Sequence, residues 1–157
     1  MAEIVGAMRI PVAVADVVVR EALFIRHIVD GEFERERVNL FPLIESGLLT
    51  VVQADNEEEL LTFIDLAVDL DDGEAMSAAL ALNRNWVLVT DDRKAERLLE
   101  GRVQLRPTLA VIRDWAEAHQ ITNDELRIAL IGVDQRGYRP AGSHSHRDWW
   151  ESVMPDS

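Results

Sequence analysis

The chain contains no cysteine, which excludes disulfide bonds and thiolate metal sites and is typical of a reducing compartment. We therefore expect a cytoplasmic protein. No apolar run approaches the roughly 20 residues that span a bilayer, so no membrane partner is expected. The N-terminal stretch lacks a basic start followed by an apolar core and a cleavage site, and we expect no secretory signal. The 157 residues suffice for one domain with a core.

Basic residues are also scarce, because 16 Lys and Arg face 29 Asp and Glu and the net charge is −13. This balance argues against nucleic-acid binding over most of the surface, since phosphate contacts need basic side chains. Two local arrangements would reverse the argument. Clustered carboxylates could hold divalent cations that face phosphate, or basic side chains could line one rim. A basic partner protein is a third use of an acidic surface.

Short apolar segments alternate with helical patterns, which predicts an α/β fold with a mostly parallel sheet. We expect strands at "IPVAVAD", "LLTVVQA", Trp86–Val89 and "VQL". We expect helices at "VVVREALFIRHIV" after Asp16 as N-cap, "LFPLIESG", "NEEELLTFIDLAVDL", Gly73–Asn83, Arg93–Leu99, "RPTLAVIRDWAEAHQ" and "TNDELRIALIGV". The β-branched run Val17–Val19 leaves open that the first strand continues there. The segment "GEFERERVN" reads as charged surface.

Acidic residues gather at the starts of two predicted helices. Asp71, Asp72 and Glu74 open the helix Gly73–Asn83, and Asp71 and Glu74 have the spacing of a capping box. Thr90, Asp91 and Asp92 directly follow the strand Trp86–Val89, and Thr90 or Asp91 could cap the next helix, although one cap needs only one side chain. Helix capping alone is therefore one interpretation of both groups.

A metal site is the second interpretation of these acids. Glu21, taken alone, reads as part of a solvated helix face, but it also follows a predicted strand. Polar groups beyond the carboxyl ends of parallel strands converge on one crevice. Several carboxylates there would repel one another unless protonated or bound to a cation, and oxygen ligands suit Mg²⁺ or Mn²⁺.

The stretches "VVVREAL", "DDGEAMSAALAL" and "WVLVTDDRKAERL" resemble the PIN domain, a metal-dependent nuclease fold. The resemblance runs from Ile10 to Leu105 and is nearest to bacterial and archaeal PIN proteins, which include the toxin ribonucleases of toxin–antitoxin pairs. It implies a three-layer fold with a mostly parallel central sheet and added C-terminal helices. The implied division is a PIN-like domain at 1–105, a helical extension at 106–134 and a loop-like or mobile tail at 135–157.

The resemblance also implies an activity, the hydrolysis of RNA phosphodiesters with Mg²⁺ or Mn²⁺. Matched position by position, the catalytic metal ligands would be Glu21, Glu74 and Asp92, with Thr90 and Asp91 in support. Arg93, Lys94 and Arg97 follow the acids and are expected to contact nucleic acid, with a solvated face as the competing interpretation. The implied partners are RNA and an antitoxin protein, and self-association into a homo-oligomer is a further expectation.

The chain departs from the family pattern at its N-terminus, because no strand ending in an aspartate precedes "IPVAVAD". Truncation, a start assigned to an internal methionine, or a natural degenerate member would each explain this, and the last is the least attractive because it exposes unpaired strands. Asp16 ends a different strand and is not expected to replace the ligand. Restoring such a strand with its aspartate should raise metal affinity and activity. The alternative function is a catalytically inactive module that binds nucleic acid or protein.

Three C-terminal motifs have structural explanations that compete with functional ones. His144, His146 and Asp148 could bind a transition metal, but two histidines in a polar tail are more often solvated. Trp149 and Trp150 could stack on bases or dock into a partner, although packing on the domain is the favoured explanation. The segment Thr122–Glu125 has the pattern of a capping box and needs no function.

Overall fold

The computed structural model describes residues 2–8, 10–21, 24–29 and 32–154. The chain divides into two compact units, of which one comprises residues 1–22 and 39–111 and the other residues 23–38 and 112–157. A hairpin from the N-terminal third therefore belongs with the C-terminal helices. The division expected from the resemblance, at 105/106 and 134/135, stays a prediction.

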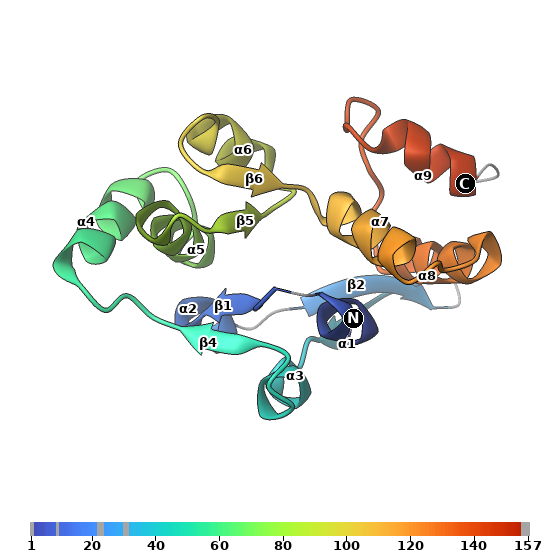
Figure 1. Ribbon diagram of the computed structural model, residues 1–157, viewed down its shortest axis with the longest axis horizontal. Helices are drawn as coiled ribbons and strands as arrows, with labels where there is room; N and C mark the ends of the chain where they lie inside the picture. Colours follow the sequence, from blue (N-terminus) through green and yellow to red (C-terminus); the bar gives the residue numbers. More distant parts are fainter. Residues whose placement is uncertain (1, 9, 22–23, 30–31, 155–157) are drawn as a thin grey trace. The chain divides into compact units, whose positions relative to one another are not determined.

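The first unit holds the acidic segments. Its elements are α1 (Ala2–Ala7), β1 (Ala13–Ala15), α2 (Asp16–Arg20), α3 (Phe41–Glu45), β4 (Thr50–Val52), α4 (Glu57–Leu66), α5 (Asp72–Arg84), β5 (Val87–Val89), α6 (Arg93–Leu99) and β6 (Gln104–Arg106) (Figure 1). Helix α7 (Thr108–Ala118) begins in this unit and ends in the other. Most bounds lie within two residues of the sequence expectations.

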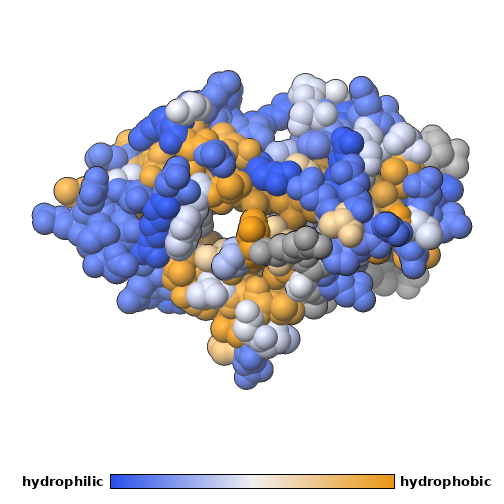
Figure 2. All heavy atoms as spheres, in the orientation of Figure 1, coloured by the Kyte–Doolittle hydropathy of each residue, from blue (hydrophilic) through white to orange (hydrophobic). Residues whose placement is uncertain are grey.

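Two parallel pairs of strands make up the sheets of this unit. β1 pairs with β4 with Ala13 opposite Thr50, and β5 pairs with β6 with Val87 opposite Gln104. Within the described residues no strand joins the two pairs, so the structure is α/β but one central three-layer sheet is not confirmed. Val51, Val87 and Val89 are exposed, and Figure 2 shows hydrophobic residues gathered over β4 and over the β5–β6 pair.

Helix α5 carries the core of the unit. Its sequence is rich in alanine, and Ala75, Ala78 and Ala79 are fully buried, which lets α4 and the strands approach its backbone closely. Leu66 of α4 and Leu99 of α6 complete one cluster around these alanines. On the other side, β1 packs on α5 through Ala15 and a second small cluster. Segments far apart in sequence thus meet on one helix.

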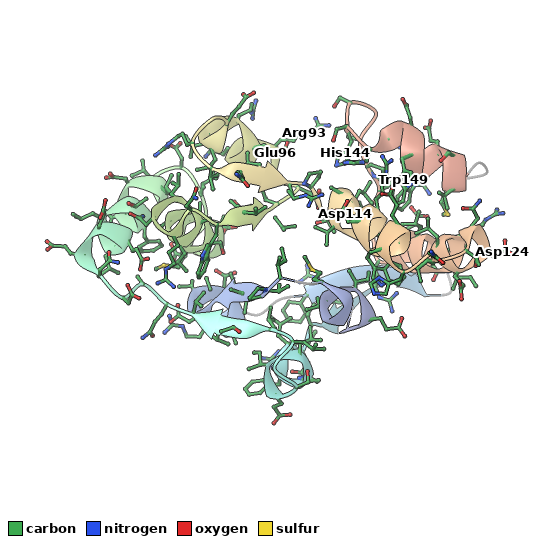
Figure 3. All side chains as sticks on the ribbon, viewed as in Figure 1. Arg93, Glu96, Asp114, Asp124, His144 and Trp149 are labelled. Carbon is green, nitrogen blue, oxygen red and sulfur yellow. The ribbon has the colours of Figure 1, made fainter. Side chains whose placement is uncertain are left out.

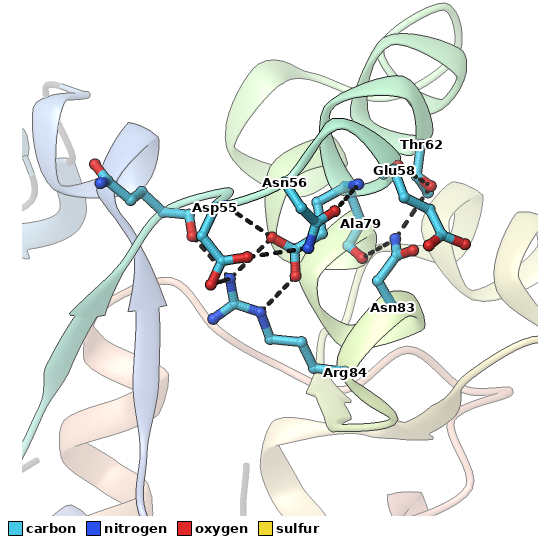
Figure 4. A network of polar contacts seen from close by, with 9 residues as sticks. Asp55, Asn56, Glu58, Thr62, Ala79, Asn83 and Arg84 are labelled. Atoms are coloured by element: carbon cyan, nitrogen blue, oxygen red, sulfur yellow. Dashed lines mark hydrogen bonds and ion pairs between the residues drawn. The ribbon is translucent and has the colours of Figure 1, made fainter.

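A buried ion pair joins α4 to the end of α5. Glu59 is almost fully buried, and both its carboxylate oxygens accept hydrogen bonds from Arg84, Oε1 from Nε at 2.6 Å and Oε2 from Nη2 at 2.9 Å (Figure 4). Arg84 Nη2 also donates to the carbonyl oxygen of Gln53, and the backbone N–H of Asp55 donates to Glu59 Oε2. The pair therefore ties the segment after β4 to the α4–α5 helix pair.

The second unit contains an element that the sequence interpretation assigned wrongly. Helix α2 ends at Arg20, and Asp16 lies in its first turn as the ion-pair partner of Arg20 instead of acting as N-cap. The expected helix continuing to Val29 is replaced by strand β2 (Phe24–Val29), which pairs antiparallel with β3 (Glu32–Arg37) in the segment expected to be charged surface. β-Branched and aromatic residues favour the extended form, namely Phe24, Ile25, Ile28 and Val29 in β2 and Phe33 in β3.

The C-terminal segment is also more ordered than a loop-like tail. Helix α8 (Asn123–Gln135) begins with the expected capping box between Thr122 and Glu125. After it, α9 (Arg147–Val153) forms, and Trp150 on this helix is fully buried with its ring edge toward Tyr138. Burial of one large indole offsets the glycine, proline and charge that predicted a loop. None of the described helices combines the length and apolarity needed to span a membrane.

Candidate functional site

Two aspartates of the predicted site cap the helices that they precede. Asp71 Oδ1 accepts a hydrogen bond of 2.8 Å from the backbone N–H of Glu74 at the start of α5. Asp92 Oδ1 accepts from the N–H groups of Lys94 and Ala95, at 2.7 and 2.8 Å, at the start of α6. The cap expected at Asp71 is confirmed, whereas α6 is capped by Asp92 and not by Thr90 or Asp91. Each of the two aspartates retains a second carboxylate oxygen that makes no helix cap.

The two supporting residues after β5 are also engaged with backbone. Thr90 Oγ1 accepts a hydrogen bond of 3.1 Å from the N–H of Asp92. Asp91 Oδ1 accepts one of 3.1 Å from the N–H of Thr108, the first residue of α7. Each of the three oxygen-bearing side chains at this junction therefore orders the chain locally, and together they fix where Asp92 stands.

Glu21 lies directly against the first turn of α5. A Cβ atom placed on Gly73 would stand 2.8 Å from Glu21 Oε1 and 2.9 Å from Oε2. Only glycine therefore lets the carboxylate occupy this position, beside the residue that precedes Glu74. The sequence places Glu21 and Gly73 more than fifty residues apart, and the structure brings the predicted ligand to the start of α5.

The pKa of Glu74 is shifted by the other carboxylates of the acidic group. Burial is the largest cause that raises the pKa of Glu74 above its ordinary value. Neighbouring carboxylates raise this pKa further, and these are, in order of effect, Asp71, Asp92 and Glu21. Lys94 lowers it. The three residues predicted as metal ligands are thus close enough to interact electrostatically, although they come from three separate segments.

The acids of this site differ in what their side chains do. Asp71 and Asp92 cap helices, whereas the carboxylates of Glu21 and Glu74 accept no hydrogen bond from the described residues. Carboxylates held together without donors are destabilising unless a proton or a cation neutralises them. Their oxygen-only chemistry fits Mg²⁺ or Mn²⁺. Within the described residues, however, no three His, Asp or Glu side chains are grouped closely enough to hold an ion as they stand.

Three basic residues on α6 adjoin this site. Arg93 lies at the start of the helix (Figure 3). Lys94 Nζ donates to the carbonyl oxygen of Asp69 and lies 3.6 Å from its Oδ1. Arg97 Nε donates to the carbonyl oxygen of Arg93 at 3.1 Å. The side chains of all three are exposed, so phosphate contact stays a prediction that their position permits.

The C-terminal histidines form a local contact of a different kind. His144 Nδ1 accepts a hydrogen bond from the N–H of His146, and the two rings lie 6.0 Å apart. The ring of His146 in turn meets the edge of Trp149. Like the other His, Asp and Glu residues that the structure describes, His144, His146 and Asp148 form no group of three that could hold a metal ion. Packing within this segment explains them.

Sequence reasoning missed Gly73 and Asp69. The approach of Glu21 to Gly73 has no local signal, because glycine at the start of a helix is unremarkable and its partner is remote. The contact of Lys94 with Asp69 likewise spans 25 residues. Comparisons of the chain with protein-family models, with curated proteins and with solved structures find no match.

Proposed function

We propose that this protein is a metal-dependent ribonuclease of PIN type that hydrolyses RNA phosphodiesters, as the toxin of a toxin–antitoxin pair would. Glu21, Glu74 and Asp92 would hold Mg²⁺ or Mn²⁺, directly or through water. The observation that supports the proposal is their convergence on the first turn of α5, where two of them have no donor among the described residues. A cation there would neutralise the group whose mutual repulsion raises the pKa of Glu74.

The residues of the chain supply position and charge for this reaction. Asp92 is held by its caps on α6, and Gly73 gives Glu21 room beside α5. Arg93, Lys94 and Arg97 follow within two turns and would attract the phosphate backbone to an otherwise acidic surface. The bound metal would supply an activated water and would stabilise charge that develops on the phosphoryl oxygens. Metal binding would require Glu21, Glu74 and Asp92 to move together from their present positions.

Metal binding can be tested without activity by thermal unfolding with and without Mn²⁺. Wild-type protein should gain about 2.7 kcal/mol at a hundredfold excess over Kd, a rise in Tm of roughly 5–10 °C for a chain of this size. The variant Glu74→Gln combined with Asp92→Asn should lose this rise, and asparagine preserves the α6 cap. Asp72→Asn is the matched control, because Asp72 opens the same helix. Equal shifts in all three proteins would refute the proposed ligands.

A non-catalytic module that binds nucleic acid or a basic protein is the second candidate. The observation that favours it is that Asp71, Asp91 and Asp92 already have structural roles as caps, which need no metal. RNA cleavage separates the two candidates. The ribonuclease requires cleavage that depends on both the divalent cation and Glu74, whereas RNA binding without such cleavage would favour the module.

A further inference from the structure

A row of apolar side chains lies on the exposed side of α4. The row comprises Leu60, Leu61 and Ile64 on the helix and Val68 in the turn after it, exposed by 47, 56, 59 and 81%. Their spacing of one, four and eight residues places them on one side. The opposite side of α4 packs on α5 through Phe63 and Leu66. This α4 row therefore contributes nothing to the described core.

Acidic residues border the α4 row along one side and at its N-terminal end. Glu57, Glu58, Asp65 and Asp69 are exposed on α4 or in the turn after it. Residues 38–83 contain ten Asp and Glu and no Lys or Arg. A second copy of the chain docked on this row would bring these carboxylates against their counterparts, which costs free energy. The charge pattern therefore selects a partner that is apolar at its centre and basic at its edges.

We propose that the α4 row docks an amphipathic helix of a partner protein, with an apolar stripe bordered by Lys and Arg. From Leu60 to Val68 the row extends about 12 Å, or roughly two turns, which is the length over which two helices interlock their side chains. Lysine and arginine stems would cover the rim of the row while their charges meet Glu58 and Asp65. This surface does not include the acids at the start of α5, so the inference does not depend on the proposed function.

A synthetic peptide tests the proposal by fluorescence anisotropy with the full chain. The probe has about 18 residues, or five turns, with leucine on one face and lysine beside it. A control peptide has the same composition but a scrambled order without an apolar face. Wild-type protein should bind the probe, and Leu61→Gln combined with Ile64→Gln should weaken binding by roughly tenfold or more. Asp65→Lys combined with Glu58→Lys should weaken it to a similar degree.

Matched substitutions on α8 separate docking from general attraction to an acidic protein. Ile128→Gln replaces an apolar side chain that is also exposed, and Asp124→Lys reverses an exposed acid; both should leave binding unchanged. Circular dichroism should show that all variants are folded, since every substituted side chain is exposed. Equal binding of the scrambled peptide, or equal loss in the α8 variants, would overturn the proposal. Sedimentation showing a dimer that Leu61→Gln with Ile64→Gln dissociates would identify a second copy as the occupant and would also overturn it.

Discussion

Arg84 Nε donates a hydrogen bond of 2.6 Å to Glu59 Oε1, although the two residues lie 25 positions apart. The hydrogen bonds from Arg84 are the largest cause that lowers the pKa of Glu59 from 4.5 to about 2, against the opposing effect of burial. The pair is enclosed, with only 2% of the Glu59 side chain and 20% of the Arg84 side chain exposed. Its charges are therefore less screened than those of surface pairs.

Replacing Glu59 with glutamine should destabilise the protein in a manner that depends on pH. Because the pKa of Glu59 is lower in the folded than in the unfolded protein, its charged form stabilises the fold. This stabilisation is about 3 kcal/mol at neutral pH, is complete above about pH 4.5 and is lost as the pH falls toward 2. Tm of Glu59→Gln at pH 7 should fall by roughly 6–12 °C. Thermal melts between pH 2.5 and 7 should show the difference from wild type shrinking in acid. Glu58→Gln, one position earlier and exposed, should change Tm by little at any pH.

Gly73→Ala should weaken metal binding without lowering the stability of the metal-free protein. Alanine is the better helix former by about 0.5–1 kcal/mol, and the atoms that its Cβ would meet are the movable end of Glu21. We therefore expect an unchanged or slightly raised Tm without metal. The Cβ displaces the Glu21 carboxylate, so the Mn²⁺-induced rise in Tm should shrink to that of Glu21→Gln. A full Mn²⁺ response in both Gly73→Ala and Glu21→Gln would show that Glu21 is not a ligand.

Glu74→Gln should stabilise the metal-free protein at neutral pH. The pKa of Glu74 is raised in the folded state, so folding takes up protons and stability falls as the pH rises from about 4.5 through that raised pKa. Glutamine removes this cost. Chemical unfolding should give a higher free energy for the variant at pH 7 and no such gain at pH 4, where Glu74 is largely protonated in both states. A variant less stable than wild type at pH 7 would contradict the repulsion inferred here.

Trp150→Ala should be far more damaging than Trp149→Ala. Trp150 is fully buried, and truncation of a buried tryptophan costs roughly 3–5 kcal/mol. Trp149 is partly exposed and meets His146 at a ring edge, so its loss should cost about 1 kcal/mol. Proteolysis of the C-terminal segment, followed by mass spectrometry, should reveal early cleavage in Trp150→Ala only. Equal protection of both variants would mean that α9 is not held by its indole.

Local signals account for most of what the sequence predicted. Asn56, Asp71 and Thr122 each predict a helix start through a side chain that caps the helix, and these three helices begin there. Before α6 the cap is Asp92, one or two residues later than the expected Asp91 or Thr90. The hairpin was missed because Asp16 and the apolar residues after it also suit a helix. The aromatic and β-branched residues from Phe24 to Val29 also suit a strand, and the structure forms the strand.

Contacts between residues that are far apart in the sequence could not be predicted from local patterns. The partners Glu59 and Arg84, like Glu21 and Gly73, meet only because α4 and α2 both pack on α5. The resemblance anticipated that Glu21, Glu74 and Asp92 would converge, whereas composition alone did not. Whether they bind metal stays a prediction, because capping explains Asp92 without it.

The acidic residues of the site have different structural roles, and this has an evolutionary consequence. Asp71, Asp91 and Asp92 each complete the backbone hydrogen bonding of a helix start, so selection for folding alone would preserve them, or asparagine and serine in their place, in a lineage without the proposed activity. The side chains of Glu21 and Glu74 cap no described helix, and burial together with the neighbouring carboxylates raises the pKa of Glu74, so its charged form opposes folding. In such a lineage the two glutamates would be the first residues to be substituted, and Gly73 could then be replaced as well.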